Sequence, residues 1–146
     1  MIDTESRQPT DIYAIDNGAI NNWIVSDKAC PIDKGGRVKM DDGATLVRTI
    51  EMQYNDVDIN GHINSVKYIE HVLDLWGLDW YREHQIKRFE IAYVAEAHQG
   101  DTLSFYRERL RVGEQSSGMQ TGENEYCVRI CKNGDVECCR SKVVFK

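Results

Sequence analysis

The stretch that decides the fold is Tyr54–Ile69, YNDVDINGHINSVKYI. Polar side chains stand at every second position of its first part, at Asp56, Asp58, Asn60, His62 and Asn64. An apolar pattern with helical spacing follows directly, and the first turn of a helix favours a carbonyl oxygen or an anion. Carboxylate, carboxamide and imidazole groups beside such a turn are suited to adding water to an acyl group. The stretch therefore predicts a polar loop that leads into a buried helix, with a hydrolytic site at their junction.

The predicted helix begins at Asn64 or Ser65, either of which can cap it, and runs to about Trp76. Two neighbouring apolar stripes cover a broad arc of its surface, so we expect a sheet to wrap around it. The stripes consist of Val66, Ile69, Leu73 and Trp76, and of Tyr68, Val72 and Leu75. The residues left for water are Lys67, Glu70, His71 and Asp74. Gly77 fits the end of this helix, and residues 78–84 predict a short helical turn.

Alternating apolar and polar residues predict strands on both sides of the helix. One strand, at residues 45–53, precedes the polar loop. Strands at residues 87–97, 102–112, 119–132 and 135–145 follow the helix, with turns at Gly100–Asp101 and Asn133–Gly134. These elements predict an α+β domain in which the strands after the helix form an antiparallel meander. We assign the domain to residues 41–146, and a linker or accessory segment to residues 1–40.

Size and composition limit the classes of function. The chain has 146 residues, of which 41% are hydrophobic and 29% charged, as expected for one globular domain with a core. A net charge of −6 without a long basic run argues against nucleic acid as a partner. No apolar run approaches the ~18 residues of a membrane-spanning helix, and the first residues lack the pattern of a signal peptide. We therefore expect a cytoplasmic location, no membrane association and free thiols.

The cysteines near the end of the sequence could suggest a metal site, and they are Cys127, Cys131, Cys138 and Cys139. Zinc ligands usually occur as spaced pairs on turns, whereas these residues fall in strand patterns. The adjacent Cys138 and Cys139 are expected to point to opposite faces of one strand. We therefore expect small buried side chains, and neither a metal nor another cofactor.

The stretch Tyr54–Ile69 closely resembles the signature of the acyl-acyl-carrier-protein thioesterases of plants and bacteria, roughly W-N-D-x-D-x-N-x-H-V-N-N-x-K-Y. The order of strand, helix and four strands is similar to that of the hotdog fold of these enzymes. The resemblance is strong over residues 41–146. It implies an α+β hotdog domain in which a curved antiparallel sheet wraps a long central helix. Family members have two hotdog halves, and the resemblance implies that this chain is the second.

The resemblance also implies the site residues. Asp58, Asn60 and His62 match the Asp, Asn and His of the signature. Glu96 matches the acidic residue on the strand after the helix, so these four residues are expected to be catalytic. The residues expected to bind substrate are Gly61, Ile63 and Asn64. Many members have a Cys after the acidic residue, but here that position is Ala97. A thiol nucleophile at this position is excluded, and water is the expected nucleophile.

Each site residue has an expected role. Glu96 is expected to act as the general base, while His62 hydrogen-bonds the water or the leaving thiol. Asp58 is expected to orient Asn60 or His62. Backbone N–H groups near residues 62–64, together with the Asn60 amide, are expected to hold the oxyanion.

Several polar residues have simpler interpretations. Asp56 is expected to cap the loop or to pair with a lysine, and Asn64 is a better candidate for a helix cap than for a catalyst. His71, His84 and His98 show no pattern of partners, and we expect them at the surface.

The resemblance implies hydrolysis of fatty acyl-carrier protein to free fatty acid in fatty acid biosynthesis, with acyl carrier protein as the partner. Candidate docking residues are basic, although an ordinary solvated face explains them equally well: Lys67, Lys87, Arg88, Arg107, Arg109 and Arg111. Two alternatives stay open, namely a hotdog acyl-CoA thioesterase and a non-catalytic hotdog module for binding or assembly. A single curved sheet leaves an open strand edge, so we expect a homodimer or pairing with a second hotdog half.

Overall fold

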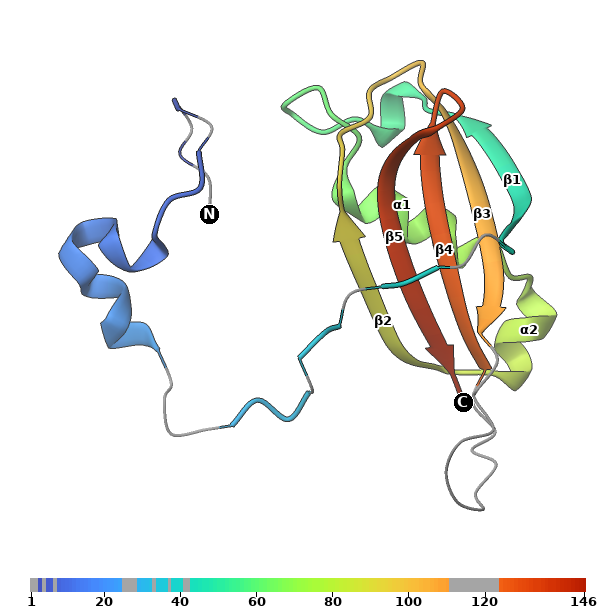
Figure 1. Ribbon diagram of the computed structural model, residues 1–146, viewed down its shortest axis with the longest axis horizontal. Coiled ribbons are helices and arrows are strands. Elements are labelled where there is room, and N and C mark those ends of the chain that lie inside the picture. The colour runs from blue at the N-terminus through green and yellow to red at the C-terminus, as the bar shows by residue number, and fades with distance from the viewer. Residues whose placement is uncertain are drawn as a thin grey trace. The chain divides into compact units, whose positions relative to one another are not determined.

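The computed structural model describes residues 3, 5–6, 8–24, 29–32, 34–36, 38–40, 43–110 and 124–146. The chain divides into two compact units, Met1–Lys34 and Gly35–Lys146 (Figure 1). In the first unit the 3₁₀ helix η1 (Ile12–Trp23) follows Asp11, whose side chain accepts a hydrogen bond from the N–H of Tyr13. The boundary expected between residues 40 and 41 lies inside the second unit. The assignment of residues 1–40 as a linker stays a prediction.

The described residues of the second unit form a five-stranded antiparallel sheet. Its strands are β1 (Thr45–Glu51), β2 (Ile86–Tyr93), β3 (Thr102–Leu110), β4 (Asn124–Lys132) and β5 (Val136–Phe145). Their order across the sheet is β1-β3-β4-β5-β2. The strands curve, and α1 (Ser65–Leu73) lies against one face of the sheet (Figure 1). The predicted α+β architecture is therefore confirmed.

The prediction of a meander of four strands is wrong for its first member. β3, β4 and β5 pair in chain order, but β2 lies beside β5, at the edge opposite to β1. Phe89 pairs with Val143, and Ile91 pairs with Ser141, so β2 extends the buried face of β5. The helix thus joins the two edges of the sheet. Alternation of residues identifies a strand, but it does not identify the neighbours of that strand.

The bounds of the strands agree with the predictions within two residues for β1, β3 and β5, as far as these are described. The exception is the strand predicted at residues 87–97, which ends at Tyr93. Residues 94–99 leave the sheet, and this change decides the environment of Glu96. The predicted strand ends and loop that fall within residues 111–123 lie outside the described residues.

The helix α1 is shorter than predicted. It begins after Asn64, whose Oδ1 accepts the N–H of Val66 at 2.9 Å, so the predicted N-cap is confirmed. A tight turn follows the helix, in which the N–H of Trp76 donates to the carbonyl three residues earlier at 3.3 Å. The predicted helical turn is confirmed as α2 (Leu78–Glu83). No helix among the described residues has both the length and the apolar character needed to cross a membrane.

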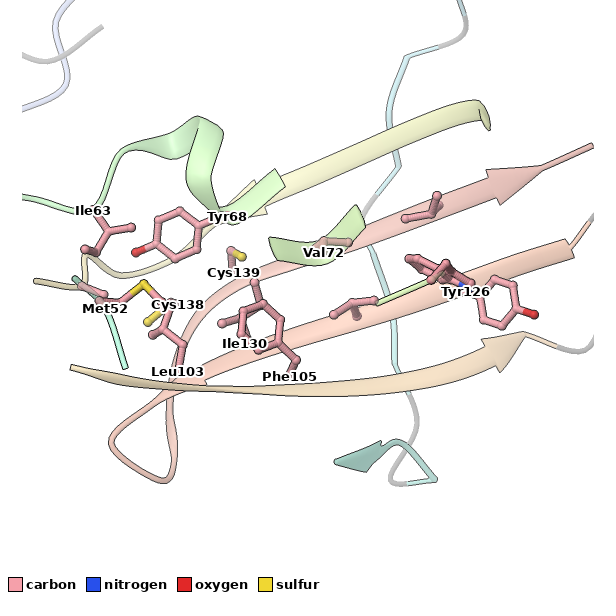
Figure 2. Close-up of a cluster of buried hydrophobic side chains, with 14 of the residues drawn as sticks. Met52, Ile63, Tyr68, Val72, Leu103, Phe105, Tyr126, Ile130, Cys138 and Cys139 are labelled. Carbon is pink, nitrogen blue, oxygen red and sulfur yellow. The ribbon is translucent and has the colours of Figure 1, made fainter. Parts of the chain in front are cut away.

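The core lies between α1 and the sheet (Figure 2). Trp76, which was assigned to the first predicted stripe, lies beyond the end of α1 and is buried. Within α1, Tyr68 and Val72 of the second predicted stripe are buried, whereas Val66 of the first stripe is 52% exposed. The inward face of the helix is therefore turned toward the second stripe. The buried residues that the rest of the unit contributes include Met52, Ile63, Leu103, Phe105, Tyr126, Val128, Ile130, Val143 and Phe145.

The cysteines of β4 and β5 are buried free thiols, as predicted. Cys138 and Cys139 both belong to the core cluster, and Figure 2 shows both sulfur atoms. The expectation of opposite faces is wrong, because the register shifts between Ile130 and Cys131 and leaves Cys138 as an extra residue. Burial raises the pKa of all of these thiols, and that of Cys127 reaches about 11.

Candidate active site

The polar loop after β1 folds back on itself. It starts with the single turn η2 (Tyr54–Asp56), and an isolated bridge then joins Val57 to Ile63. Gly61 lies in the tip between them at a φ of +82°, with no atom within 4 Å of the place that a Cβ would take. The left-handed backbone, rather than close packing, therefore favours glycine there. Ile59, also at the tip, is fully exposed at 100%.

Asp58 closes the tip of this loop. Its Oδ1 accepts the backbone N–H of Asn60 at 2.8 Å and that of His62 at 3.2 Å. Partial burial raises the pKa of Asp58, but hydrogen bonds from these N–H groups and from the Asn60 side chain outweigh it and leave this pKa below the ordinary value. The carboxylate is thus ionised at neutral pH. It contacts Asn60, and it reaches His62 through the backbone rather than through the imidazole.

His62 and Glu96 come together from distant parts of the chain. The Nε2 of His62 lies 3.4 Å from the Oε2 of Glu96, and their side chains are 30% and 55% exposed. Glu96 lies on the segment after β2, so its expected place in a buried strand is wrong. An imidazole and a carboxylate this close together can both reach one water beside them and move its proton.

One backbone hydrogen bond ties the two halves of this pair together. The N–H of Ile63 donates to the carbonyl of Ala97 at 2.8 Å, so the residues that follow His62 and Glu96 are bonded directly. The side chain of Ile63 is buried in the core, and Ala97 is fully buried. The substrate-binding roles of Gly61, Ile63 and Asn64 stay predictions.

The backbone N–H groups expected to hold an oxyanion already have acceptors within the protein. These bonds run from His62 to Asp58 at 3.2 Å, from Ile63 to Ala97 at 2.8 Å and from Asn64 to Asp56 at 2.8 Å. The next N–H along the chain is that of Ser65, the first residue of α1. In the described part of the chain it has no acceptor. This N–H is therefore the one available at the junction of loop and helix.

His71 is a residue near the site that was not predicted from the sequence. Its side chain was expected at the surface but is 17% exposed, and its Nε2 lies 3.5 Å from the Oδ1 of Asp56. The Oδ2 of Asp56 accepts the N–H of Gln53 at 2.8 Å, so the expected role of Asp56 as a loop cap is confirmed. The partial burial of His71 could have been predicted, because His71 lies three residues after the buried Tyr68 and thus beside it on the helix surface.

The other two histidines differ from each other. His98 is 53% exposed, as predicted, and its ring packs edge-on against the ring of His62 with centroids 5.1 Å apart. His84 was expected at the surface but is half-buried, because its ring stacks on Trp80 at 3.7 Å. Of these two histidines, His98 is therefore the one that lies beside the pair of His62 and Glu96.

The basic residues considered for docking are largely engaged. Lys67 pairs with Glu70 at 2.8 Å, and the guanidinium of Arg107 lies over the ring of Trp76 at 5.2 Å. The remaining pairs are Arg88 with Glu90 and Arg109 with Asn124. Arg111 lies outside the described residues. Among the described residues, no group of three or more His, Cys, Asp or Glu side chains is arranged to hold a metal ion.

Comparison with solved structures places this architecture among the hotdog thioesterases. An acyl-ACP thioesterase from Bacteroides thetaiotaomicron is 41% identical over 99% of this chain and 53% of its own, with a TM-score of 0.78. The 12:0-ACP thioesterase from Umbellularia californica shares the fold at 20% identity, over 99% of this chain and 51% of its own, with a TM-score of 0.70. The predicted hotdog fold is thus confirmed. The chain spans about half the length of these two structures.

The family follows from the sequence match. The family model described as the acyl-ACP thioesterase C-terminal domain matches residues 39–145. The chain therefore belongs to the acyl-ACP thioesterase family, and it corresponds to the C-terminal hotdog domain. No curated protein matches the chain.

Proposed function

We propose that this chain carries the hydrolytic site of an acyl-ACP thioesterase, which releases free fatty acid from acyl carrier protein in fatty acid biosynthesis. Membership of the family supports the class of reaction. The observation that carries the proposal is the 3.4 Å approach of His62 Nε2 to Glu96 Oε2 beside the first turn of α1. A cytoplasmic location stays a prediction from the sequence.

The positions of these groups support the following reaction. Glu96 takes a proton from water, and the water oxygen bonds to the thioester carbon while the carbonyl electrons move onto its oxygen. The N–H of Ser65 and the Asn60 amide stabilise this oxyanion. When the oxyanion collapses, the C–S bond breaks and the leaving sulfur takes a proton from the pair of His62 and Glu96. The products are a fatty acid and a free thiol.

We also propose that a second hotdog domain covers the edge of β2. This strand pairs with β5 on one side, and no partner strand lies on its other side among the described residues. Apolar side chains are exposed at this end of the sheet, with Ile86 at 40%, Tyr93 at 48% and Val94 at 65%. Unpaired strand edges tend to find partners. The covering domain is a second copy of the chain or an N-terminal hotdog half, and a monodisperse monomer in light scattering would contradict the proposal for the chain alone.

The function is tested by following thiol release from an acyl-ACP and from the matching acyl-CoA. We expect Glu96→Gln and His62→Ala each to lower turnover by about 10²–10⁴-fold. Glu83→Gln is the matched control, because Glu83 is exposed on α2. Faster turnover of acyl-CoA than of acyl-ACP would instead identify acyl-CoA as the substrate. Full turnover of Glu96→Gln would refute the assignment of the base.

The same assay separates an enzyme from a binding module. If the folded chain alone shows no turnover, the N-terminal hotdog half is added back. Recovery of turnover then shows that the site needs both halves. Continued inactivity, with acyl-ACP still bound, would identify a non-catalytic module.

A further inference from the structure

The segment that carries Glu96 lies outside the sheet, so its position depends on a few specific contacts. The N–H groups of Val94 and Ala95 both donate to the carbonyl of Cys138, at 2.7 and 3.1 Å. These bonds end before Glu96. Other contacts must therefore fix the direction of its side chain.

Lys132 makes the first of these contacts. It is the final residue of β4, and its Nζ donates to the backbone carbonyl of Glu96 at 2.6 Å. The Lys132 side chain is only 21% exposed, so little water competes for its ammonium group. A charged donor makes a stronger hydrogen bond than a neutral one. Lys132 thus holds the backbone of Glu96 itself.

Asp101 makes a second contact, from the turn before β3. Its Oδ2 accepts the backbone N–H of His98 at 2.9 Å and lies 4.0 Å from Lys132 Nζ. Its Oδ1 accepts the side-chain amide of Asn133 at 2.7 Å. These hydrogen bonds hold the pKa of Asp101 below its ordinary value, and the bond from Asn133 has the largest effect. The Asp101 carboxylate therefore joins the hairpin between β4 and β5 to the segment that carries Glu96.

Three consecutive residues are thus held by three different elements. Glu96 is held by Lys132 of β4, Ala97 by the N–H of Ile63 in the polar loop, and His98 by Asp101. This arrangement fixes the backbone on both sides of the Glu96 carboxylate. The polar loop also carries His62, so the same contacts set the separation between His62 and Glu96.

We propose that Lys132 and Asp101 are positioning residues, which hold the Glu96 carboxylate opposite His62. The catalytic part of this proposal rests on the proposed function. Catalytic groups lose efficiency steeply when they are displaced by about 1 Å, with costs near a hundredfold. The placement of the segment, in contrast, is a property of the free protein and does not depend on any substrate.

The test compares Lys132→Met with Lys132→Arg in the purified 146-residue chain. Lys142→Met is the matched control, because Lys142 on β5 pairs with Glu125 at 2.7 Å and is 29% exposed. The first measurement is hydrogen exchange of the Ile63 N–H, which reports its bond to Ala97. We expect Lys132→Met to speed this exchange by about tenfold relative to the wild type and to Lys142→Met. Lys132→Arg should restore protection.

The second measurement is turnover, in the chain alone or with the N-terminal half added. We expect Lys132→Met to lower kcat by about tenfold to a hundredfold with little change in KM, and Lys132→Arg to recover most of the loss. If the wild type shows no turnover, the proposed function fails while the exchange measurement still decides the positioning role. Unchanged exchange at Ile63, or an equal increase at all amides of the core, would overturn the proposal.

Discussion

His71 and Asp56 form a largely buried pair between α1 and the polar loop, with Nε2 and Oδ1 3.5 Å apart and side chains only 17% and 13% exposed. The ring of His71 also packs edge-on against Phe105 of β3, with centroids 6.2 Å apart. The pair therefore joins the loop that carries the site residues to the helix and the core.

A double-mutant cycle on this pair should give a clear coupling energy. We expect Asp56→Ala and His71→Ala each to lower the free energy of unfolding by about 1–3 kcal/mol, since each leaves a buried polar partner behind. The loss of unfolding free energy in the double variant should be smaller than the sum of the two single losses by about 0.5–2 kcal/mol. Urea denaturation at neutral pH measures all three. The control cycle is Asp79 with Arg82, an exposed pair at 2.6 Å that should couple by less than about 0.5 kcal/mol. Additive losses at Asp56 and His71 would show that the two side chains act independently.

Stability should fall at alkaline pH because thiols are buried. Burial raises the pKa of Cys127 from 9.0 to about 11, so the folded state holds this proton more tightly than the unfolded state. The stability that comes from this difference in pKa is fully present below pH 9.0 and is lost as pH rises from 9.0 toward about 11. Each such thiol contributes a slope of at most ~1.4 kcal/mol per pH unit.

Substitution of this thiol should therefore flatten the alkaline profile. We expect Cys127→Ala to reduce the slope of the unfolding free energy above pH 9.0 relative to the wild type. Cys30→Ala is the control, because Cys30 is exposed and its removal should leave the slope unchanged. Parallel profiles for Cys127→Ala and the wild type would mean that the Cys127 thiol ionises equally in both states.

The turn between β4 and β5 should be sensitive to the loss of its glycine. Asn133 and Gly134 have φ angles of 50° and 110°, the left-handed conformations that an Asn-Gly hairpin turn needs. We expect Gly134→Ala to lower the free energy of unfolding by about 1–2 kcal/mol. Gly43→Ala should be close to neutral, because its φ is not positive and no atom lies within 4 Å of the added Cβ. Equal stabilities of the two variants, measured by urea denaturation, would contradict the role of the turn.

The sequence was sufficient to predict most helices and strands, and the residues on one side of the site. The polar residues between β1 and α1 have a strong local signature, and the cap at Asn64 depends only on its neighbours in the chain. The approach of His62 to Glu96 was predicted only through resemblance to a family. Nothing local in the sequence indicates that the segment after Tyr93 leaves the sheet.

Long-range features were harder to predict. The place of β2 beside β5, and the burial of His71 against Asp56 and Phe105, depend on packing between residues far apart in the sequence. Alternating patterns report which face of a strand is buried, but they carry no information about the strand beside it. The extra residue at Cys138 likewise arises from pairing with β4.

The order β1-β3-β4-β5-β2 has a consequence for synthesis of the protein. The chain leaves the ribosome from its N-terminus, and domains generally fold as units during synthesis. β2 and the segment with Glu96 are made before β5, which separates β2 from β4 in the sheet. A nascent chain that lacks β5 therefore has the residues of the site without the carbonyl of Cys138 that anchors the segment at Val94 and Ala95. The site should form only after β5 has been synthesised, together with the closure of the sheet.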